Sequence, residues 1–499
     1  MPVNYDVIVV GAGVVGALTA RELARYELTV LVLEAELDAA MGATKANSAI
    51  VHGGFAEGSD TLKGRLCVLG RKKFAGLEAE LNFGFRTTGS LVLGFSGSGE
   101  RLQGLYEKGL ANGVTDLELW SGQQVRAHEP AVSPEVEGAL WCAGAGVCSP
   151  WDLALAALEN AMAHGVEVKL NQSVIAVERP ETGAWRLSTP QDSYNTRYVV
   201  NCAGLGGGHL DSLAGLYDSA LTPRSGEYLV FAQGTGSLVN SVLFQLPGPL
   251  GKGVLVGPTY QGNLLLGPDA RNEDSGRHTH TDRLRAIVEQ ANRVVSGIDL
   301  KKAIRSFTGV RPVAPGGDFL VGPANSQTHP GWLRAVGIQS PGLTASPALA
   351  ELLVTNLARE GLGLVPRAGF DPTRRALPVH LSRRPAPLSF TSAEPLTKLE
   401  PGNPERLVCR CEQVRERDLA EAFSRGVPVC TVDGLKRRTR AGMGWCQGKF
   451  CRPRVALWLQ EQLGTPVEPV EEAASSGLRR VEGRDLLGLW PPAVEKRHQ

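Results

Sequence analysis

Residues 7–16 read VIVVGAGVVG, and they predict the architecture of the N-terminal half of the chain. Its apolar half predicts a buried strand, and its glycine half predicts a tight turn into a helix. The elements expected around it are a strand over 5–10, a helix over 14–26 and a second strand over 29–34. This strand–helix–strand order predicts an α/β fold built on a parallel sheet.

The spacing of the glycines predicts a dinucleotide site at the end of the first strand. Gly11 permits a tight turn, Gly13 lets the backbone approach a pyrophosphate, and Gly16 lets the helix pack closely on the strand. Glu34 ends the second strand, where an acidic side chain binds ribose hydroxyls. The amides at the helix N-terminus favour phosphate. This fingerprint alone does not separate NAD from FAD.

Length and charge narrow the class of protein. A chain of 499 residues exceeds one ordinary core, so we expect two or three domains. The formal net charge of +1 argues against a dedicated nucleic-acid binder. The chain shows neither a secretion signal nor eighteen consecutive apolar residues. We therefore expect a cytoplasmic protein without a transmembrane segment, able to reach the inner face of a membrane only through a partner.

Later segments predict an insertion and a C-terminal module. Three short alternating runs near residues 228–266 predict an antiparallel sheet inserted into the nucleotide-binding fold. Strands are also expected over 166–170, 198–201 and 332–336, and a helix over 346–359. A stretch rich in Pro, Arg and Ser over 366–404 suits a linker. A small helical module over 405–464 and a poorly ordered tail over 465–499 follow.

Three further stretches carry a resemblance to a known family. Residues 42–54 read GATKANSAIVHGG, residues 199–204 read VVNCAG, and residues 337–347 read GIQSPGLTASP. In this order they resemble the FAD-dependent oxidoreductases of the D-amino-acid oxidase type, especially the branch that holds glycerol-3-phosphate and L-2-hydroxyglutarate dehydrogenases. The resemblance spans about residues 4–365. It implies FAD-binding segments near 1–88, 145–220 and 305–365, and substrate-domain segments near 89–144 and 221–304.

The resemblance also implies which residues surround the FAD. Thr44 and Ser48 would flank the cofactor, and Val174 would contact the adenine through its backbone. Ala203 and Gly204, in the NCAG segment, would close over the pyrophosphate. The residues Gly342, Leu343 and Thr344 can be argued directly, because they open an apolar helix whose free amides would stabilise the negative charge of a reduced flavin.

Four residues are predicted on the substrate side. His52 matches the histidine that related dehydrogenases place beside the flavin, where it would act as a base, although an isolated histidine is more often structural. Arg311 matches the arginine that grips the substrate anion; the alternative is an interface salt bridge. Lys252 and Arg224 are weaker predictions on the inserted sheet, and solvated side chains are the alternative.

One departure from the family bears on the substrate. Aerobic glycerol-3-phosphate dehydrogenases carry a Gly-Gly-Lys segment before the flavin-facing helix, where this chain reads GIQSP over 337–341. Residues 62–67, LKGRLC, look instead like a segment of the L-2-hydroxyglutarate dehydrogenases. The expected reaction is oxidation of glycerol 3-phosphate to dihydroxyacetone phosphate. The alternatives are L-2-hydroxyglutarate, an amino or opine acid, or a non-catalytic electron-transfer subunit.

Four of the nine cysteines form two tight pairs near the C-terminus. The pairs are Cys409 with Cys411 and Cys446 with Cys451, separated by 34 residues. Four thiolates suffice for one [2Fe–2S] cluster or one tetrahedral zinc ion. The stretch GLKRRTRAGMGWCQGKFC, residues 434–451, resembles the bacterioferritin-associated ferredoxin-like [2Fe–2S] domain. Zinc is the rival metal, because ligand identity alone does not choose between them.

The module implies a route for electrons. A cluster would take electrons singly from the reduced flavin and pass them to an acceptor subunit or a quinone-linked carrier. Basic residues around the second cysteine pair would offset the anionic cluster or dock an acidic partner, or would simply face solvent. These residues are Lys436, Arg437, Arg438, Arg440, Lys449, Arg452 and Arg454.

Overall fold

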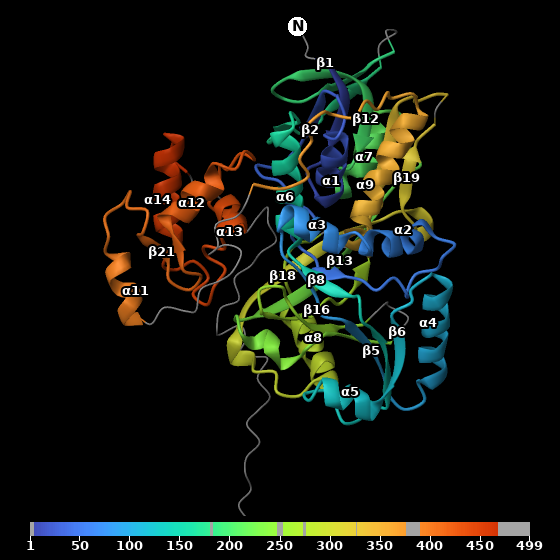
Figure 1. Cartoon of the computed structure of the whole chain (residues 1–499), viewed down its shortest axis with the longest axis vertical. Helices are drawn as coiled ribbons and strands as arrows, with labels where there is room; N and C mark the ends of the chain where they lie inside the picture. The colour runs from blue at the N-terminus through green and yellow to red at the C-terminus, as the bar shows by residue number, and fades with distance from the viewer. Residues whose placement is uncertain are drawn as a thin grey trace, which may run out of the picture.

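The computed structural model describes residues 4–179, 183–246, 253–272, 276–325, 327–375 and 390–467. Two bodies built on β-sheets lie one above the other, and a small helical module lies beside the upper body (Figure 1). Lys252 and the tail from residue 468 onward fall outside the described residues, so the predictions made for them stay predictions.

The upper body is built on an eight-stranded sheet. Its strand order is β10-β11-β12-β1-β2-β9, with β20 paired to β12 and β19 to β20. The parallel core of this sheet consists of β1 (Asn4–Val10), β2 (Val30–Leu33), β9 (Glu167–Lys169), β12 (Ser193–Asn201) and β20 (Trp332–Val336). The antiparallel strands are β10 (Ala176–Glu178), β11 (Trp185–Ser188) and β19 (Leu320–Pro323).

Alternation along β1 explains why helices cover both faces of this sheet. Val7 and Val9 point into one apolar core, whereas Ile8 and Val10 point into another, as the period of two requires. On the first face α1 contacts α6 and α9, and α7 contacts the other side (Figure 1). These helices are α1 (Val14–Leu23), α6 (Pro150–Ala163), α7 (Gly207–Leu213) and α9 (Gly342–Arg359). The sheet is therefore buried on both faces.

The lower body is built on a nine-stranded sheet inserted into the first fold. Its order is β17-β13-β16-β15-β14-β5-β7-β6, with β18 paired to β13. Its strands are β5 (Ser90–Gly94), β6 (Leu117–Ser121), β7 (Gly138–Cys142), β13 (Thr222–Phe231), β14 (Val242–Gln245), β15 (Leu255–Pro258), β16 (Leu264–Gly267), β17 (Arg271–Asn272) and β18 (Ala303–Val313). All pairs except β14–β5 are antiparallel.

Helices and a small sheet complete the two bodies. The helices are α2 (Leu62–Arg71), α3 (Phe74–Leu81), α4 (Gly99–Ala111), α5 (Gly122–His128) and α8 (Thr281–Val294). The three-stranded sheet joins β3 (Ile50–Val51), β8 (Gly146–Cys148) and β4 (Phe85–Thr87) in the order β3-β8-β4. The expected α/β fold with an inserted antiparallel sheet is confirmed. Strand β18 extends this second sheet as far as Val313, beyond the boundary near residue 304 that the sequence suggested.

The C-terminal module has its own apolar core. It consists of the hairpin β21 (Leu407–Cys409) and β22 (Val414–Arg415) with α11 (Phe390–Thr397), α12 (Glu416–Phe423), α13 (Val432–Thr439) and α14 (Arg452–Leu463). Leu419, Leu435 and Leu459 supply one buried residue from each of the last three helices. Helix α11 lies inside the segment expected to be a linker. Within the described ranges, no helix is both long and apolar enough to cross a bilayer.

Two helix boundaries differ from the expected ones. Helix α1 ends at Leu23, three residues early, because Tyr26 turns away to pair with Pro366. Helix α9 begins at Gly342, where residues 342–344 were expected to open a helix, and not at Ser346. Pro347 lacks an N–H for the carbonyl of Leu343, and the Ser346 hydroxyl donates to that carbonyl instead, at 2.8 Å. This substitution of donors lets the helix run through the proline.

Candidate functional site

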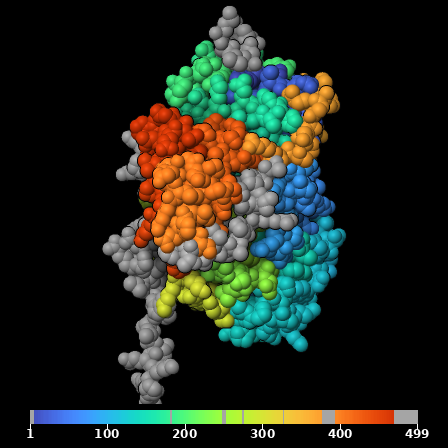
Figure 2. Space-filling model, turned by 60° about the vertical axis from the view of Figure 1, so that its left-hand side comes forward, coloured from blue at the N-terminus to red at the C-terminus, as the bar shows by residue number. Residues whose placement is uncertain are grey.

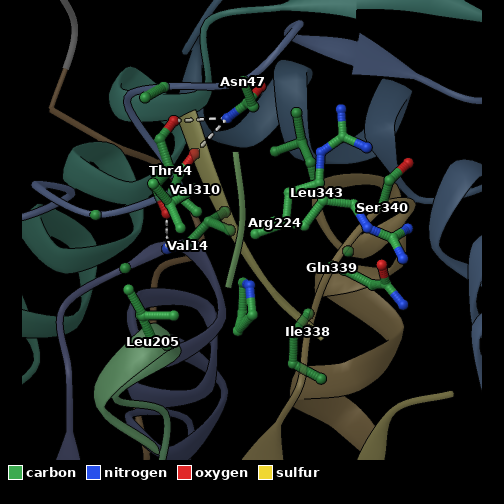
Figure 3. A pocket seen from close by; sticks show the side chains of 18 of the residues that line it. Val14, Thr44, Asn47, Leu205, Arg224, Val310, Ile338, Gln339, Ser340 and Leu343 are labelled. Carbon is green, nitrogen blue, oxygen red and sulfur yellow. Dashed lines mark hydrogen bonds between the residues drawn. The ribbon is translucent and has the colours of Figure 1, made fainter. Parts of the chain in front are cut away.

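A cavity of about 1190 Å³ lies between the two sheet bodies. One wall comes from the first strand–turn–helix, the loop over 42–48 and the turn after β12. The opposite wall comes from β13, β18 and the segment that leads into α9. Figure 3 shows Thr44 and Asn47 near Val14, with Ile338, Gln339, Ser340 and Leu343 elsewhere around the space. The volume suits a dinucleotide together with a small substrate.

The glycine turn forms one end of this cavity. A Cβ on Gly11 would lie 2.4 Å from the carbonyl oxygen of Cys202, and one on Gly16 would lie 2.0 Å from the carbonyl oxygen of Gly11. Gly13 lines the cavity, and a Cβ there would point at Thr44 Oγ1 at 3.2 Å. Gly16 is buried in the helix–turn contact and lines no part of the cavity. Gly11 and Gly13 therefore leave the backbone at the cavity wall without side chains. Gly16 lets the helix pack closely on the turn behind that wall.

Glu34 reaches the same turn from β2. Its carboxylate accepts the N–H of Ala12 at 2.7 Å and the N–H of Glu36 at 3.0 Å. Burial raises the pKa of Glu34 despite these two backbone donors. A buried carboxylate at the cavity wall is suited to hydrogen bonding with ribose hydroxyls.

The loop over 42–48 is tied to the start of α1. Thr44 Oγ1 accepts the N–H of Val14 at 3.0 Å, and Asn47 Nδ2 donates to the carbonyl oxygen of Thr44 at 2.8 Å (Figure 3). Ser48 lines the cavity, as do Val174, Ala203 and Gly204 across from it. Their roles as cofactor contacts remain predictions, and the structure places them together around one space.

The N-terminus of α9 forms the second polar end of the cavity. Gly342 and Leu343 line it, whereas Thr344 is fully buried behind them. The Thr344 hydroxyl accepts the N–H of His52 at 2.9 Å and donates to the carbonyl of Ile50 at 3.3 Å. Thr344 therefore holds His52 against the helix rather than contacting the cavity.

His52 follows β3 and projects into the cavity. Its Nε2 lies 3.4 Å from Ser340 Oγ, and its ring stacks on Phe244 with centroids 5.9 Å apart. Neither Ser340 nor Phe244 was predicted as a site residue. Ser340 lies in a quoted motif and was within reach of the sequence, but Phe244 lies on β14 without any motif.

Two arginines face each other on the lower wall. Arg224 on β13 pairs in register with Arg311 on β18, and both are half-buried and line the cavity. Arg224 Nε donates to Asn272 Oδ1 at 2.6 Å. Like charges directly opposite on neighbouring strands destabilise a sheet, so an anion between the guanidiniums would compensate. Lys252 belongs to residues 247–252, which the structure does not describe.

The residues around the cavity fit FAD. An acidic side chain and the amide end of α1 lie at one part of the wall, and the amide end of α9 lies at another. At Gly11 and Gly16 a Cβ would clash with the backbone of Cys202 and of Gly11, so only glycine permits this tight turn at the cavity wall. A flavin bound here would have His52 and the two arginines along the same cavity wall.

The four C-terminal cysteines form a second site. Cys409 and Cys451 are buried, and their thiols hydrogen bond to each other, which lowers the pKa of Cys409 to about 7. Cys411 and Cys446 are half-buried and form the other hydrogen-bonded thiol pair. A Cβ on Gly444 would lie 2.3 Å from Cys411 Cβ, so the loop around the second cysteine pair passes close to the first.

This arrangement fits a two-iron cluster. Each iron of a [2Fe–2S] cluster takes two thiolates, and the four cysteines lie as two pairs. Two pairs of thiolates also suffice for one tetrahedral zinc ion, so the pairing alone does not choose the metal.

The basic run on α13 faces inward rather than toward solvent. Arg437 is 4% exposed, and with Arg438 it donates to Asp38 in the loop after β2. Lys436 pairs with Asp433 at 3.3 Å, and Arg440 with Glu412 at 3.0 Å. Lys449 and Arg452 are exposed beside the second cysteine pair. The expected solvent-facing or partner-docking role is wrong for Arg437 and Arg438, because both side chains donate to Asp38. The sequence could not show that Asp38 lies opposite them.

Both parts of the chain match known families. Residues 6–355 match the FAD dependent oxidoreductase family, and residues 407–461 match the BFD-like [2Fe-2S] binding domain. A glycerol 3-phosphate dehydrogenase from Caloramator mitchellensis is 38% identical over 471 residues, 94% of this chain and 96% of the relative. A glycerol 3-phosphate oxidase from Mycoplasma pneumoniae is 30% identical over 359 residues, 69% of this chain and 92% of the relative.

A solved structure supports the same relationship. The dithionite-reduced L-alpha-glycerophosphate oxidase from Mycoplasma pneumoniae, with FAD bound, superposes with a TM-score of 0.71 at 27% identity. The superposition covers 75% of this chain and 99% of the oxidase. The part of this chain beyond such an oxidase includes the [2Fe-2S] binding domain.

Proposed function

The chain belongs to the FAD dependent oxidoreductase family and carries a [2Fe-2S] binding domain, and from this premise we propose that it oxidises glycerol 3-phosphate to dihydroxyacetone phosphate. The relative named a glycerol 3-phosphate dehydrogenase matches both parts of the chain, including the cluster domain. The relatives named oxidases match the flavin part. The substrate assignment rests on these relatives together with the charge of the cavity.

The observation that carries the proposal is the arginine pair in the cavity. Arg224 and Arg311 are cross-strand neighbours, and both line the space that also contains His52. Two guanidiniums present several donors to the oxygens of one phosphate. A phosphate held there would leave the hydroxyl-bearing carbons free to extend toward His52 and the start of α9.

The chain's own residues would prepare the substrate for oxidation. FAD, when bound, supplies the hydride acceptor. His52 Nε2 would take the proton of the substrate hydroxyl, while Thr344 would hold the backbone of His52 and Phe244 would stack on its ring. The amide of Leu343 would stabilise the negative charge that develops on the cofactor, whereas the N–H of Gly342 already donates to the carbonyl of Gln339 at 2.6 Å.

The proposal includes electron exit through the [2Fe-2S] domain. The acceptor would be a partner subunit or a quinone-linked carrier rather than oxygen. The half-buried pair Cys411 and Cys446 is the more exposed half of the ligand set, so it is the side from which an acceptor would take electrons. Trp445, which is 63% exposed, lies next to Cys446 on that side.

A substrate panel tests the proposed function. Holoprotein without oxygen is mixed with glycerol 3-phosphate, L-2-hydroxyglutarate, an amino acid or glycerol, and the flavin absorbance is followed. We expect glycerol 3-phosphate to bleach the flavin at the lowest concentration, and glycerol, which lacks the phosphate, to bleach it poorly. Bleaching by L-2-hydroxyglutarate but not by glycerol 3-phosphate would show that L-2-hydroxyglutarate is the substrate and that the proposed one is wrong. Bleaching by dithionite but none of the panel would contradict the catalytic role.

A further inference from the structure

We infer that Asp38 is a positioning residue that fixes the cluster module on the flavin-binding body, so that electrons pass from flavin to cluster within one docked chain. The inference rests on the proposed electron exit and goes further, because it assigns a residue outside both cofactor sites. It also predicts a single docked arrangement rather than a tethered, mobile module.

Asp38 is the centre of a buried ion-pair network between the two parts. It is 1% exposed, and it accepts hydrogen bonds from Arg438 Nη1 at 2.9 Å and Nη2 at 2.8 Å. Arg437 donates to the same carboxylate and also pairs with Asp433 on its own helix. A Cβ on Gly434 would lie 3.2 Å from Asp38 Oδ2, so the helix backbone itself approaches the carboxylate.

The protonation of Asp38 agrees with a fixed contact. Burial alone would raise the pKa of this carboxyl, but Arg438 and Arg437 hold it below its ordinary value. The carboxylate therefore stays charged at neutral pH. Replacing Asp38 by a neutral side chain would leave two arginines buried without this carboxylate, which would strongly disfavour the docked state.

A second buried contact anchors the module at another point. Glu159 on α6 accepts from Arg425 Nε at 2.8 Å and from Arg374 Nε at 2.6 Å. Cys430 Sγ lies 3.1 Å from the carbonyl of Leu37, next to Asp38. Figure 2 shows the module, orange and red, seated against the flank of the upper body. Two separate anchors restrict rotation as well as translation.

The docked position brings the loop around Cys446, here called the cluster loop, toward the cavity wall that carries Arg311. Gln447, next to the ligand Cys446, accepts a hydrogen bond from Arg305 Nη1 at 3.3 Å. Arg305 lies on β18, the strand that also carries Arg311. Arg305 and Arg311 are six residues apart on this strand, a separation of roughly 20 Å. The same strand therefore contacts the cluster loop through Arg305 and carries Arg311 of the predicted anion site. Gly309, between them, packs against the backbone of Ala46 in the loop that lines the cavity.

Fixing this geometry matters because electron transfer slows steeply with distance. Each step moves one electron: the flavin is oxidised by one electron and the cluster is reduced by one. The second electron follows after a one-electron acceptor has reoxidised the cluster. A module that left its anchors would interrupt this sequence without changing the reduction of the flavin by substrate.

The test compares Asp38→Asn with a matched control, Glu351→Gln. Glu351 forms a surface ion pair with Lys73 on the flavin-binding body, far from the module's anchors in sequence. The flavin of the holoprotein is photoreduced without oxygen, and the appearance of the reduced cluster is followed by absorbance and EPR. Deuterium uptake in α13 is measured on the same samples.

We expect Asp38→Asn to slow cluster reduction at least tenfold and to raise deuterium uptake in α13, with unchanged FAD content. Glu351→Gln should match the unsubstituted protein. Arg438→Gln, which leaves Asp38 paired with Arg437, should give a smaller change in the same direction and guards against a general folding defect. Unchanged cluster reduction and deuterium uptake in both Asp38→Asn and Arg438→Gln would overturn the inference.

Photoreduction separates this inference from the proposed function. It reduces the flavin without substrate, so a wrong substrate leaves the comparison intact. If photoreduced flavin in the unsubstituted protein never reduces the cluster, the proposed electron exit itself fails. If transfer is fast in every variant while α13 stays protected, only the role of Asp38 is wrong.

Discussion

The most informative residues are two arginines that a folded protein has no structural reason to place face to face. Arg224 and Arg311 lie opposite each other on antiparallel strands, where like charges repel. Asn272 accepts one hydrogen bond from Arg224, but it does not neutralise either charge. The proposed function assigns this pair to the substrate anion, which would offset both charges.

Arg311→Ala should weaken substrate binding far more than it disturbs the flavin. Losing hydrogen bonds to a charged phosphate costs about 1.5–3 kcal/mol, which corresponds to a rise in KM of about 10- to 150-fold. Steady-state kinetics with an artificial acceptor and the ratio of flavin to protein absorbance measure the two effects.

Arg271→Ala provides the matched control for that prediction. Arg271 is an exposed arginine on β17 of the same sheet, and it does not line the cavity. Its substitution should leave KM unchanged. An unchanged KM for Arg311→Ala as well would remove Arg311 from the anion site.

At the scale of single residues, the sequence predicted the residues around the glycine turn better than those that contact His52. Glu34, Gly11 and Gly13 follow a spacing that the chemistry of a dinucleotide imposes, and the structure places all three together at one part of the cavity wall. Phe244 meets His52 only because β14 pairs in parallel with β5, a contact far from any motif. No local pattern could have predicted it.

At the scale of elements, the packing of α2 on α9 supports the part of the cavity that α9 lines. A Cβ on Gly70 in α2 would lie 2.0 Å from the carbonyl oxygen of Thr344, in the first turn of α9. Thr344 in turn holds His52 through a hydrogen bond of 2.9 Å. The close approach of the two helices thus determines where the histidine lies.

Gly70→Ala should therefore damage the site from a distance. The added methyl group would push the first turn of α9 away from α2, so we expect lower FAD content and a lower kcat. Gly76→Ala, in the neighbouring helix α3, is the control, because a Cβ there meets nothing within 4 Å. Flavin content and kcat equal to those of the control would show that this helix contact does not position the site.

The elements also show which boundaries a sequence can predict. The strand over 332–336 was expected with its observed bounds, because its apolar run is short and flanked by glycines. The helix expected over 346–359 begins four residues earlier, at Gly342, where residues 342–344 were expected to open it. The Ser346 hydroxyl that compensates for Pro347 is a three-dimensional detail.

At the scale of the whole molecule, the chain combines an FAD dependent oxidoreductase part with a [2Fe-2S] binding domain. The family matches assign FAD dependent oxidoreductase chemistry to one part and a [2Fe-2S] domain to the other. The sequence predicted both parts from local motifs, but it could not show that Asp38 meets Arg437 and Arg438 some 400 residues later. Only the folded structure shows that pairing.

The most direct test of the whole account is a rapid-freeze EPR experiment on the anaerobic holoprotein mixed with glycerol 3-phosphate. We predict that the flavin absorbance bleaches first and that the signal of one reduced two-iron centre per chain then appears. Iron analysis of the same sample should give two irons per chain. A bleached flavin with stoichiometric zinc and no iron signal would contradict the account of electron exit.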